Sequence, residues 1–212
     1  MYIIEIQGLE KRHGHFHLSP FDLKVEPGSI LTVLGHERAG KTTLLRLLWG
    51  LDSPDSGWVR IFNTKPTEDP ILFRESAGYA SQLDWYYPEL TTEALLEFVG
   101  GFYQNWEQHY ALEVLKELGV SNWHEIGEIG DAGRRMLGVA AALGHRPPVL
   151  ILDEPAAGLD PKARKNFIAF IRKLSRSQVT TIVVSSDSSD DLDGIGDGTL
   201  MLSHGLVQEV TC

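Results

Sequence analysis

Cysteine and long apolar stretches are both scarce in this sequence, and each scarcity excludes a class of protein. Cys212 is the single cysteine among 212 residues, so no disulfide can form within the chain, which fits a reducing cytoplasm. No apolar run approaches the roughly 18 residues that span a bilayer. The first residues also lack the basic and apolar regions of a signal peptide. We therefore expect any role at a membrane to depend on a partner.

Positive charge is also in short supply. Lysine and arginine number 19 against 29 aspartate and glutamate residues, and the formal net charge is −10. An acidic protein repels phosphate backbones, so we expect no nucleic-acid partner. A nucleotide site stays possible, because it needs local backbone N–H groups and one or two cations rather than a basic surface. The hydrophobic share of 42% and the charged share of 23% are typical of a folded domain.

Short apolar runs that alternate with helical patterns predict an α/β fold with a mostly parallel sheet. Ile30–Leu34 and Val149–Leu152 have the length and composition of buried strands. Pro20 requires the strand around it to lie at a sheet edge or to bend. We expect one domain over 1–212, in which 83–145 is a helical lobe inserted into a core of 1–82 and 146–212. The other predicted strands are Tyr2–Leu9, Phe16–Val25, Trp58–Phe62, Val179–Ser185, Leu200–Leu202 and Leu206–Val210, and the predicted helices are Thr43–Trp49, Thr91–Phe102, Trp106–Leu118, Arg134–Leu143 and Pro161–Leu174.

A glycine-rich loop between a predicted strand and a predicted helix fits the pattern GxxxxGK[ST] without a mismatch. Glycines let the backbone wrap around phosphate oxygens, and the helix N-terminus offers free N–H groups and a positive dipole end. In this pattern Lys41 supplies a charge for the β and γ phosphates, and Thr42 a hydroxyl for Mg²⁺. The predicted nucleotide-binding residues are Gly35, His36, Glu37, Arg38, Ala39, Gly40, Lys41, Thr42 and Thr43.

Two adjacent carboxylates follow the predicted strand Val149–Leu152. A strand that ends in this way can direct one carboxylate to a metal ion and the other to a water molecule. We predict Asp153 as a Mg²⁺ ligand and Glu154 as the catalytic residue, either the general base or the group that orients the water. The alternative is that both are solvated acids at the end of a strand.

Together, GHERAGKT (Gly35–Thr42), LILDEPAAGLDP (Leu150–Pro161) and Gln82 between them resemble the nucleotide-binding domain of ABC transporters. The resemblance covers nearly the whole chain, and the LDEP…GLDP stretch is its most specific part. It implies a P-loop NTPase core with a mostly parallel central sheet, an N-terminal antiparallel β part and an inserted helical lobe. It also implies that ATP and Mg²⁺ are the cofactors and that two such domains bind head to tail.

The resemblance assigns further roles residue by residue. His13, within Lys11–Gly14, takes the place of the aromatic residue that stacks on adenine, although an exposed turn histidine is the alternative. Gln82 corresponds to the glutamine that senses Mg²⁺, and so joins Lys41 and Glu154 as catalytic and Thr42 and Asp153 as metal-binding. Asp160 corresponds to the aspartate that acts across the dimer.

Two segments depart from the family pattern. The signature segment, usually Leu-Ser-Gly-Gly-Gln, aligns by spacing with Ile129, Gly130, Asp131, Ala132 and Gly133, which lack its serine hydroxyl and introduce a carboxylate. After the strand Val179–Ser185, the family has a histidine that touches the γ-phosphate, and this chain has Asp187. We therefore expect hydrolysis that is weak or depends on a partner, while ATP binding is retained.

The resemblance implies an ATPase subunit that drives export through separate membrane subunits. The GLDP form and Phe102–Trp106 favour exporters, and the dimer is either a homodimer or a heterodimer with a second ATPase. Such a subunit lies in the cytoplasm, at the inner face of the cell membrane. The membrane subunit is expected to dock near Gln82 and Leu83–Leu90, where Trp85, Tyr86 and Tyr87 form an aromatic cluster that otherwise packs within the lobe. The alternative function is an ATP-gated dimerisation or regulatory module with little turnover.

Overall fold

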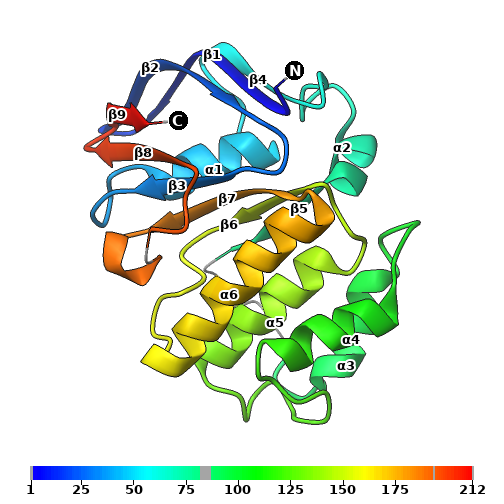
Figure 1. The fold of residues 1–212 in the computed structure, drawn as a ribbon. Coiled ribbons are helices and arrows are strands. Elements are labelled where there is room, and N and C mark those ends of the chain that lie inside the picture. Colours follow the sequence, from blue (N-terminus) through cyan, green and yellow to red (C-terminus); the bar gives the residue numbers. More distant parts are fainter. Residues whose placement is uncertain (1, 82–86, 193, 212) are drawn as a thin grey trace.

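The computed structural model describes residues 2–81, 87–192 and 194–211, and it has two sheets (Figure 1). The first is antiparallel, with the order β2-β1-β4. Its strands are β1 (Ile4–His13), β2 (Phe16–Val25) and β4 (Ser56–Ile61). Pro20 lies in an edge strand beside an irregularity in the pairing of β1 with β2, as predicted.

The central sheet has the order β5-β6-β7-β3-β8-β9, and only the pair of β8 with β9 is antiparallel among its described pairs. Its strands are β3 (Ile30–Leu34), β5 (Ala77–Ala80), β6 (Val149–Leu152), β7 (Thr181–Ser186), β8 (Gly198–Ser203) and β9 (Leu206–Thr211). The helices are α1 (Lys41–Trp49), α2 (Pro70–Ser76), α3 (Thr92–Gly100), α4 (Gln108–Glu117), α5 (Asp131–Leu143) and α6 (Pro161–Gln178), with a 3₁₀ turn η1 at Ser189–Asp191. The predicted fold class is confirmed.

Alternate residues of the central strands face two separate hydrophobic cores. Val149 and Ile151 pack with α1 and the antiparallel sheet. Leu150 and Leu152 pack with α5 and α6, around the fully buried Phe167. Figure 1 shows the result: α1 lies between the two sheets, and α5 and α6 cover the opposite face of the central sheet. Among the described residues, no helix is both long and apolar enough to cross a bilayer.

Several predicted boundaries were wrong, and a helix, a strand and the 3₁₀ turn η1 were missed. The first strand begins later and runs on to His13, because its far end pairs with Phe16 of β2. Helix α2 was missed although Asp69 caps it by accepting a hydrogen bond from Leu72 N–H at 3.0 Å. Strand β5 has the sequence AGYA, which has no clear strand pattern, and it is fixed by parallel pairing with β6.

Helix α5 begins at Asp131 rather than at Arg134. Gly130 is its N-cap residue, and the carboxylate of Asp131 lies in the first turn, where it interacts favourably with the helix dipole. The predicted signature residues Asp131, Ala132 and Gly133 are therefore helical. Helix α1 likewise begins two residues earlier than predicted, at Lys41.

Candidate nucleotide site

The loop between β3 and α1 has the backbone form that the phosphate pattern requires. Gly40 is the N-cap of α1 with φ of 111°, and a Cβ there would lie 2.5 Å from Cζ of Phe16, so only glycine fits. Gly40 has no side chain that could cap the helix. The first-turn N–H groups of α1 lack intrahelical partners, and they form the kind of site that binds an anion.

Lys41 lies under this loop and is only 4% exposed. Its Nζ lies 2.8 Å from the carbonyl oxygen of Gly35 and 3.3 Å from that of His36. The same ammonium lies 3.1 Å from Oε1 of Glu154 and forms a close ion pair with Asp187. Burial acts to lower the pKa of Lys41, but the hydrogen bonds to Asp187 and Glu154 outweigh it and the pKa is raised. The side chain is therefore a fully charged ammonium.

A hydroxyl and a carboxylate stand side by side next to Lys41. Thr42 Oγ1 donates to Oδ2 of Asp153 at 2.7 Å, and Ser185 Oγ donates to Oδ1 of the same carboxylate at 2.7 Å. The N–H of Glu154 donates to Ser185 Oγ at 2.9 Å, which locks the end of β6 against β7. Within the described ranges no group of three potential metal-ligating side chains forms. Two oxygen donors nevertheless fit Mg²⁺, which commonly uses one or two protein ligands with phosphate and water oxygens.

Glu154 and Asp187 meet at Lys41 from the ends of neighbouring strands. Glu154 has a φ of 49°, so its backbone turns sharply directly after Asp153. Burial raises the pKa of Glu154 above its ordinary value, although Lys41 acts to lower it. Partial burial acts to raise the pKa of Asp187 too, but the hydrogen bond from Lys41 outweighs it and the pKa is lowered. Glu154 is thus the better proton acceptor of the two.

A cavity of about 540 Å³ opens over the loop. Phe16, which was not predicted as a site residue, packs over Gly40 and lines it. The only sign of Phe16 in the sequence is an aromatic residue at the start of a strand, three positions after His13. Ser185 was also given no role, although a serine at the end of a buried strand was visible. The lining residues are Phe16, Glu37, Arg38, Gly40, Lys41, Thr42, Thr43, Glu154 and Asp187.

His13 lies outside that cavity. It is exposed at the end of β1 and lines a second cavity of about 400 Å³ together with Lys11, Arg46 and Asp52. Thr43 lines both cavities, so they are neighbours. His13 is therefore close to the phosphate loop, but Phe16 is the aromatic ring that lies directly over it.

The predicted signature segment stands apart from this cavity, since none of its residues lines it. The guanidinium of Arg134 forms a close ion pair with Asp131 and donates to the carbonyl of Ile129 at 2.9 Å. The Asp131 carboxylate is thus paired within its own helix turn and is 72% exposed.

The structure describes some of the remaining predicted residues and leaves others outside the described ranges. Asp160 is the N-cap of α6, where its carboxylate accepts from the N–H groups of Lys162 and Ala163 at 2.8 and 2.9 Å. This capping contact explains an aspartate at position 160 within a single chain, without a role across a dimer. Gln82, Trp85 and Tyr86 lie outside the described residues, and Tyr87 is exposed.

The glycine-rich loop, the buried lysine and the Thr42–Asp153 pair together have the geometry expected of a P-loop. Comparison with protein families agrees: the ABC transporter model matches residues 18–157, so this chain belongs to that family. A dimeric ATP-binding cassette bound to ADP and Pi has the same fold, with a TM-score of 0.87 at 23% identity over 98% of this chain and 97% of that one.

Two curated relatives have different transport roles in their names. The bacitracin transport ATP-binding protein BcrA of Enterococcus faecalis is 32% identical over 99% of this chain. The sulfate/thiosulfate import ATP-binding protein CysA of Synechococcus elongatus is 29% identical over 98% of it. The chain spans 69% and 62% of the length of these two relatives, respectively.

Proposed function

We propose that this chain binds Mg-ATP and couples its binding and hydrolysis to export through separate membrane subunits. The observation that carries the proposal is the Thr42–Asp153 oxygen pair, 2.7 Å apart, beside the buried ammonium of Lys41. A hydroxyl, a carboxylate and a fixed cation at a helix N-terminus form a set suited to a metal-bound triphosphate.

Each group then has a separate task. Lys41 neutralises charge on the β and γ phosphates, and Thr42 and Asp153 hold Mg²⁺, with Gln82 as the further ligand that the family pattern implies. Bound Mg²⁺ would offset phosphate charge as it develops during transfer. Glu154, with its raised pKa, orients the attacking water and accepts its proton. His13 and Phe16 are the two candidates for contact with the base or ribose.

The proposed working unit is a head-to-tail pair of such subunits, either two copies of this chain or this chain and a second ATPase. The residues Ile129–Gly133 would face the partner's nucleotide, as would Asp160. Because Asp131 and Asp187 both add negative charge near phosphate, we propose that hydrolysis is weak or needs a partner with an intact signature. The proposed location is the cytoplasmic face of the cell membrane. The proposed direction, export, rests on the sequence resemblance, since one relative is named for bacitracin transport and the other for sulfate import.

Steady-state Mg-ATP hydrolysis tests the proposal. The purified chain should be measured across protein concentrations beside Glu154→Gln, which keeps the shape of the side chain and removes the base. We expect a low rate that rises with concentration in the wild type and falls by about a hundredfold or more in the variant. Equal rates in the two proteins would exclude Glu154 as the base.

A second function, an ATP-gated module with little turnover, is favoured by one observation. Lys41 is already paired with two carboxylates, Glu154 and Asp187, so its positive charge is compensated without a nucleotide. Purification from membranes distinguishes the two functions. A multi-span partner supports the transporter subunit, and a soluble partner alone supports the gated module.

A further inference from the structure

The hydrogen-bonding capacity of the Lys41 ammonium is already used in full. It has three N–H donors and four oxygen acceptors within reach: two loop carbonyls, Glu154 and Asp187. A phosphate oxygen that approaches Lys41 must therefore take the place of an existing acceptor. Which acceptor leaves decides which nucleotide is favoured.

The two loop carbonyls and Glu154 are held in place by the fold. Gly35 and His36 belong to the loop itself, and the Glu154 backbone is fixed by its N–H bond to buried Ser185. Asp187 differs from all three because its side chain is 47% exposed, so water can solvate it when it leaves Lys41. Asp187 is consequently the acceptor that a phosphate displaces.

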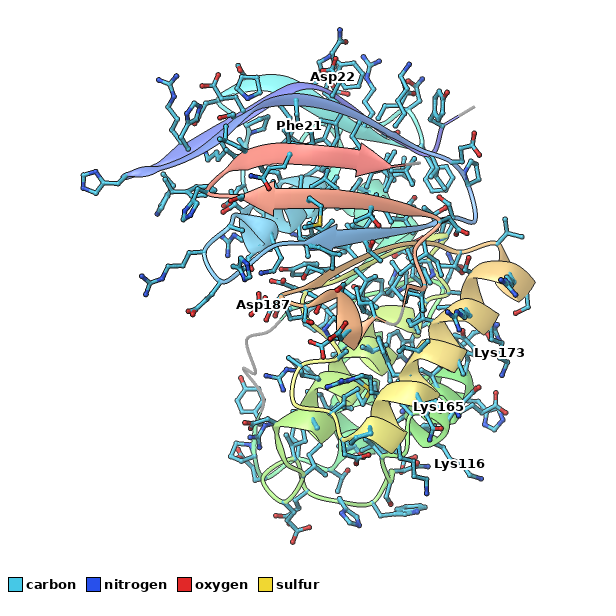
Figure 2. All side chains as sticks on the ribbon, turned by 60° about the vertical axis from the view of Figure 1, so that its left-hand side comes forward. Phe21, Asp22, Lys116, Lys165, Lys173 and Asp187 are labelled. Atoms are coloured by element: carbon cyan, nitrogen blue, oxygen red, sulfur yellow. The ribbon has the colours of Figure 1, made fainter. Side chains whose placement is uncertain are left out.

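The backbone nevertheless keeps Asp187 close to the loop. The N–H of Gly35 donates to the carbonyl of Ser186 at 3.3 Å, which ties the residue before Asp187 to the first residue of the phosphate loop. Ser186 Oγ contacts Asp191 at 3.2 Å and accepts from Ser188 N–H at 3.2 Å, which closes the turn that follows. Figure 2 shows Asp187 at the edge of the central sheet on the side of the loop and α1. Asp187 thus remains available to pair with Lys41 again.

The lysine of this loop pattern serves the β and γ phosphates, so carboxylates that contact its ammonium are expected to lie close to the outermost phosphate of a triphosphate. The amide groups at the start of α1 hold the inner phosphates. Glu154 and Asp187 reach Lys41 from the ends of β6 and β7 instead. A third phosphate must break the pair of Lys41 with Asp187 and then lie close to both carboxylates. A diphosphate also competes for Lys41, but it places no further phosphate beside the two carboxylates.

We propose that Asp187 is a specificity-determining residue that competes with the γ-phosphate for Lys41, and so shifts the preference of this site from nucleoside triphosphates toward diphosphates. The proposal rests on the proposed nucleotide site and adds a selectivity to it. It also gives Asp187 a function of its own, in addition to replacing the family's histidine.

Equilibrium binding of ADP and of a non-hydrolysable ATP analogue, both with Mg²⁺, tests this on the full chain. We expect Asp187→Asn to strengthen binding of the ATP analogue by roughly tenfold and binding of ADP by less than about threefold, as befits a half-exposed ion pair. Asp187→Glu keeps the charge, and we expect it to keep most of the discrimination. Because Asp187 is on the surface, these variants should fold, and thermal unfolding checks that they do.

The matched control is Asp190→Asn, which removes the same charge from an exposed position in the same turn. A shift of the ATP-to-ADP ratio in Asp187→Asn alone supports the proposal. Equal shifts in both variants, or an unchanged ratio while both nucleotides bind, overturn it and leave the nucleotide site intact. Failure of the wild type to bind either nucleotide, or equal binding by Lys41→Ala, would overturn the proposed function itself.

Discussion

Asp153 and Asp131 are both acidic residues at the end of a regular element, yet their surroundings differ completely. Asp153 is 3% exposed, and its two carboxylate oxygens accept from hydroxyls on α1 and β7. Asp131 is paired with Arg134 in its own helix turn, in water. Three elements far apart in sequence thus hold Asp153, the proposed metal ligand. A single helix turn holds Asp131 of the proposed signature segment. A site that must fix a metal needs that rigidity, and a surface that meets a partner does not.

Lys41→Ala is expected to have the largest effect, because it removes the buried cation of the loop cavity, whereas Arg38, which also lines the cavity, is exposed. It also leaves Glu154 and Asp187 without their shared partner. We expect ATP turnover to fall by more than about a hundredfold, as for loss of a buried charge partner. Lys165→Ala, at an exposed position on α6, is the control and should keep the wild-type rate in the same assay.

Asp153→Ala and Asp131→Ala test the comparison directly through stability. Loss of the Asp153 carboxylate leaves the hydroxyls of Thr42 and Ser185 without an acceptor, which should reduce the free energy of unfolding by about 1–3 kcal/mol. Loss of the exposed Asp131 should change it by less than about 1 kcal/mol. Urea unfolding of the three proteins measures both differences. Similar losses would show that the buried network adds nothing beyond the exposed pair.

Restoring family residues at the signature segment should raise activity moderately. The double substitution Gly130→Ser and Asp131→Gly supplies a hydroxyl and removes a carboxylate. If two copies of this chain form the working pair, we expect turnover to rise roughly tenfold, which is below the effect of a full oxyanion-hole donor. Glu128→Gln removes a nearby exposed charge and should leave the rate unchanged. An unaltered rate in the double variant would place the limit on hydrolysis elsewhere, with Asp187 as the next residue to change.

His145 should give the smallest effect, seen as a pH dependence of stability away from the nucleotide. It is buried, stacks on Tyr103 with ring centroids 4.1 Å apart, and its Nε2 lies 3.2 Å from the carbonyl oxygen of Ala77. Burial lowers the pKa of His145, although the Ala77 carbonyl and Glu75 act to raise it. The unfolded chain therefore binds this proton at a higher pH than the folded chain.

The stability from neutral His145 is present above the unfolded pKa of about 6.5 and is lost as the pH falls through the lower folded value. We expect the urea midpoint to decrease between about pH 7.5 and pH 5. The decrease should be smaller in His145→Gln, while His109→Gln, at an exposed position, keeps the wild-type slope. An identical slope in all three proteins would contradict this account.

Most of the fold could be predicted because its elements carry local signals. The buried strands Ile30–Leu34 and Val149–Leu152 are apolar throughout, and the loop before α1 and the Asp160-Pro161 start of α6 have strong sequence patterns. Strand β5 could not be found, since its four residues become a strand only by pairing with β6. The extension of β1 to His13 has the same cause, because pairing across a hairpin is a property of two segments.

The candidate site likewise has a part that the sequence predicts and a part that only the tertiary structure decides. The types and order of Lys41, Thr42, Asp153 and Glu154 predict a nucleotide site because phosphate and metal chemistry restricts which residues can serve. The sequence alone also shows the departures from the family pattern at Ile129–Gly133 and Asp187. Only the tertiary structure decided that Phe16 covers Gly40, that Ser185 holds Asp153, and that Asp187 pairs with Lys41. These contacts join residues up to 146 positions apart. They exist because the parallel order β6-β7-β3 brings the ends of three strands to one edge of the sheet, which no local pattern encodes.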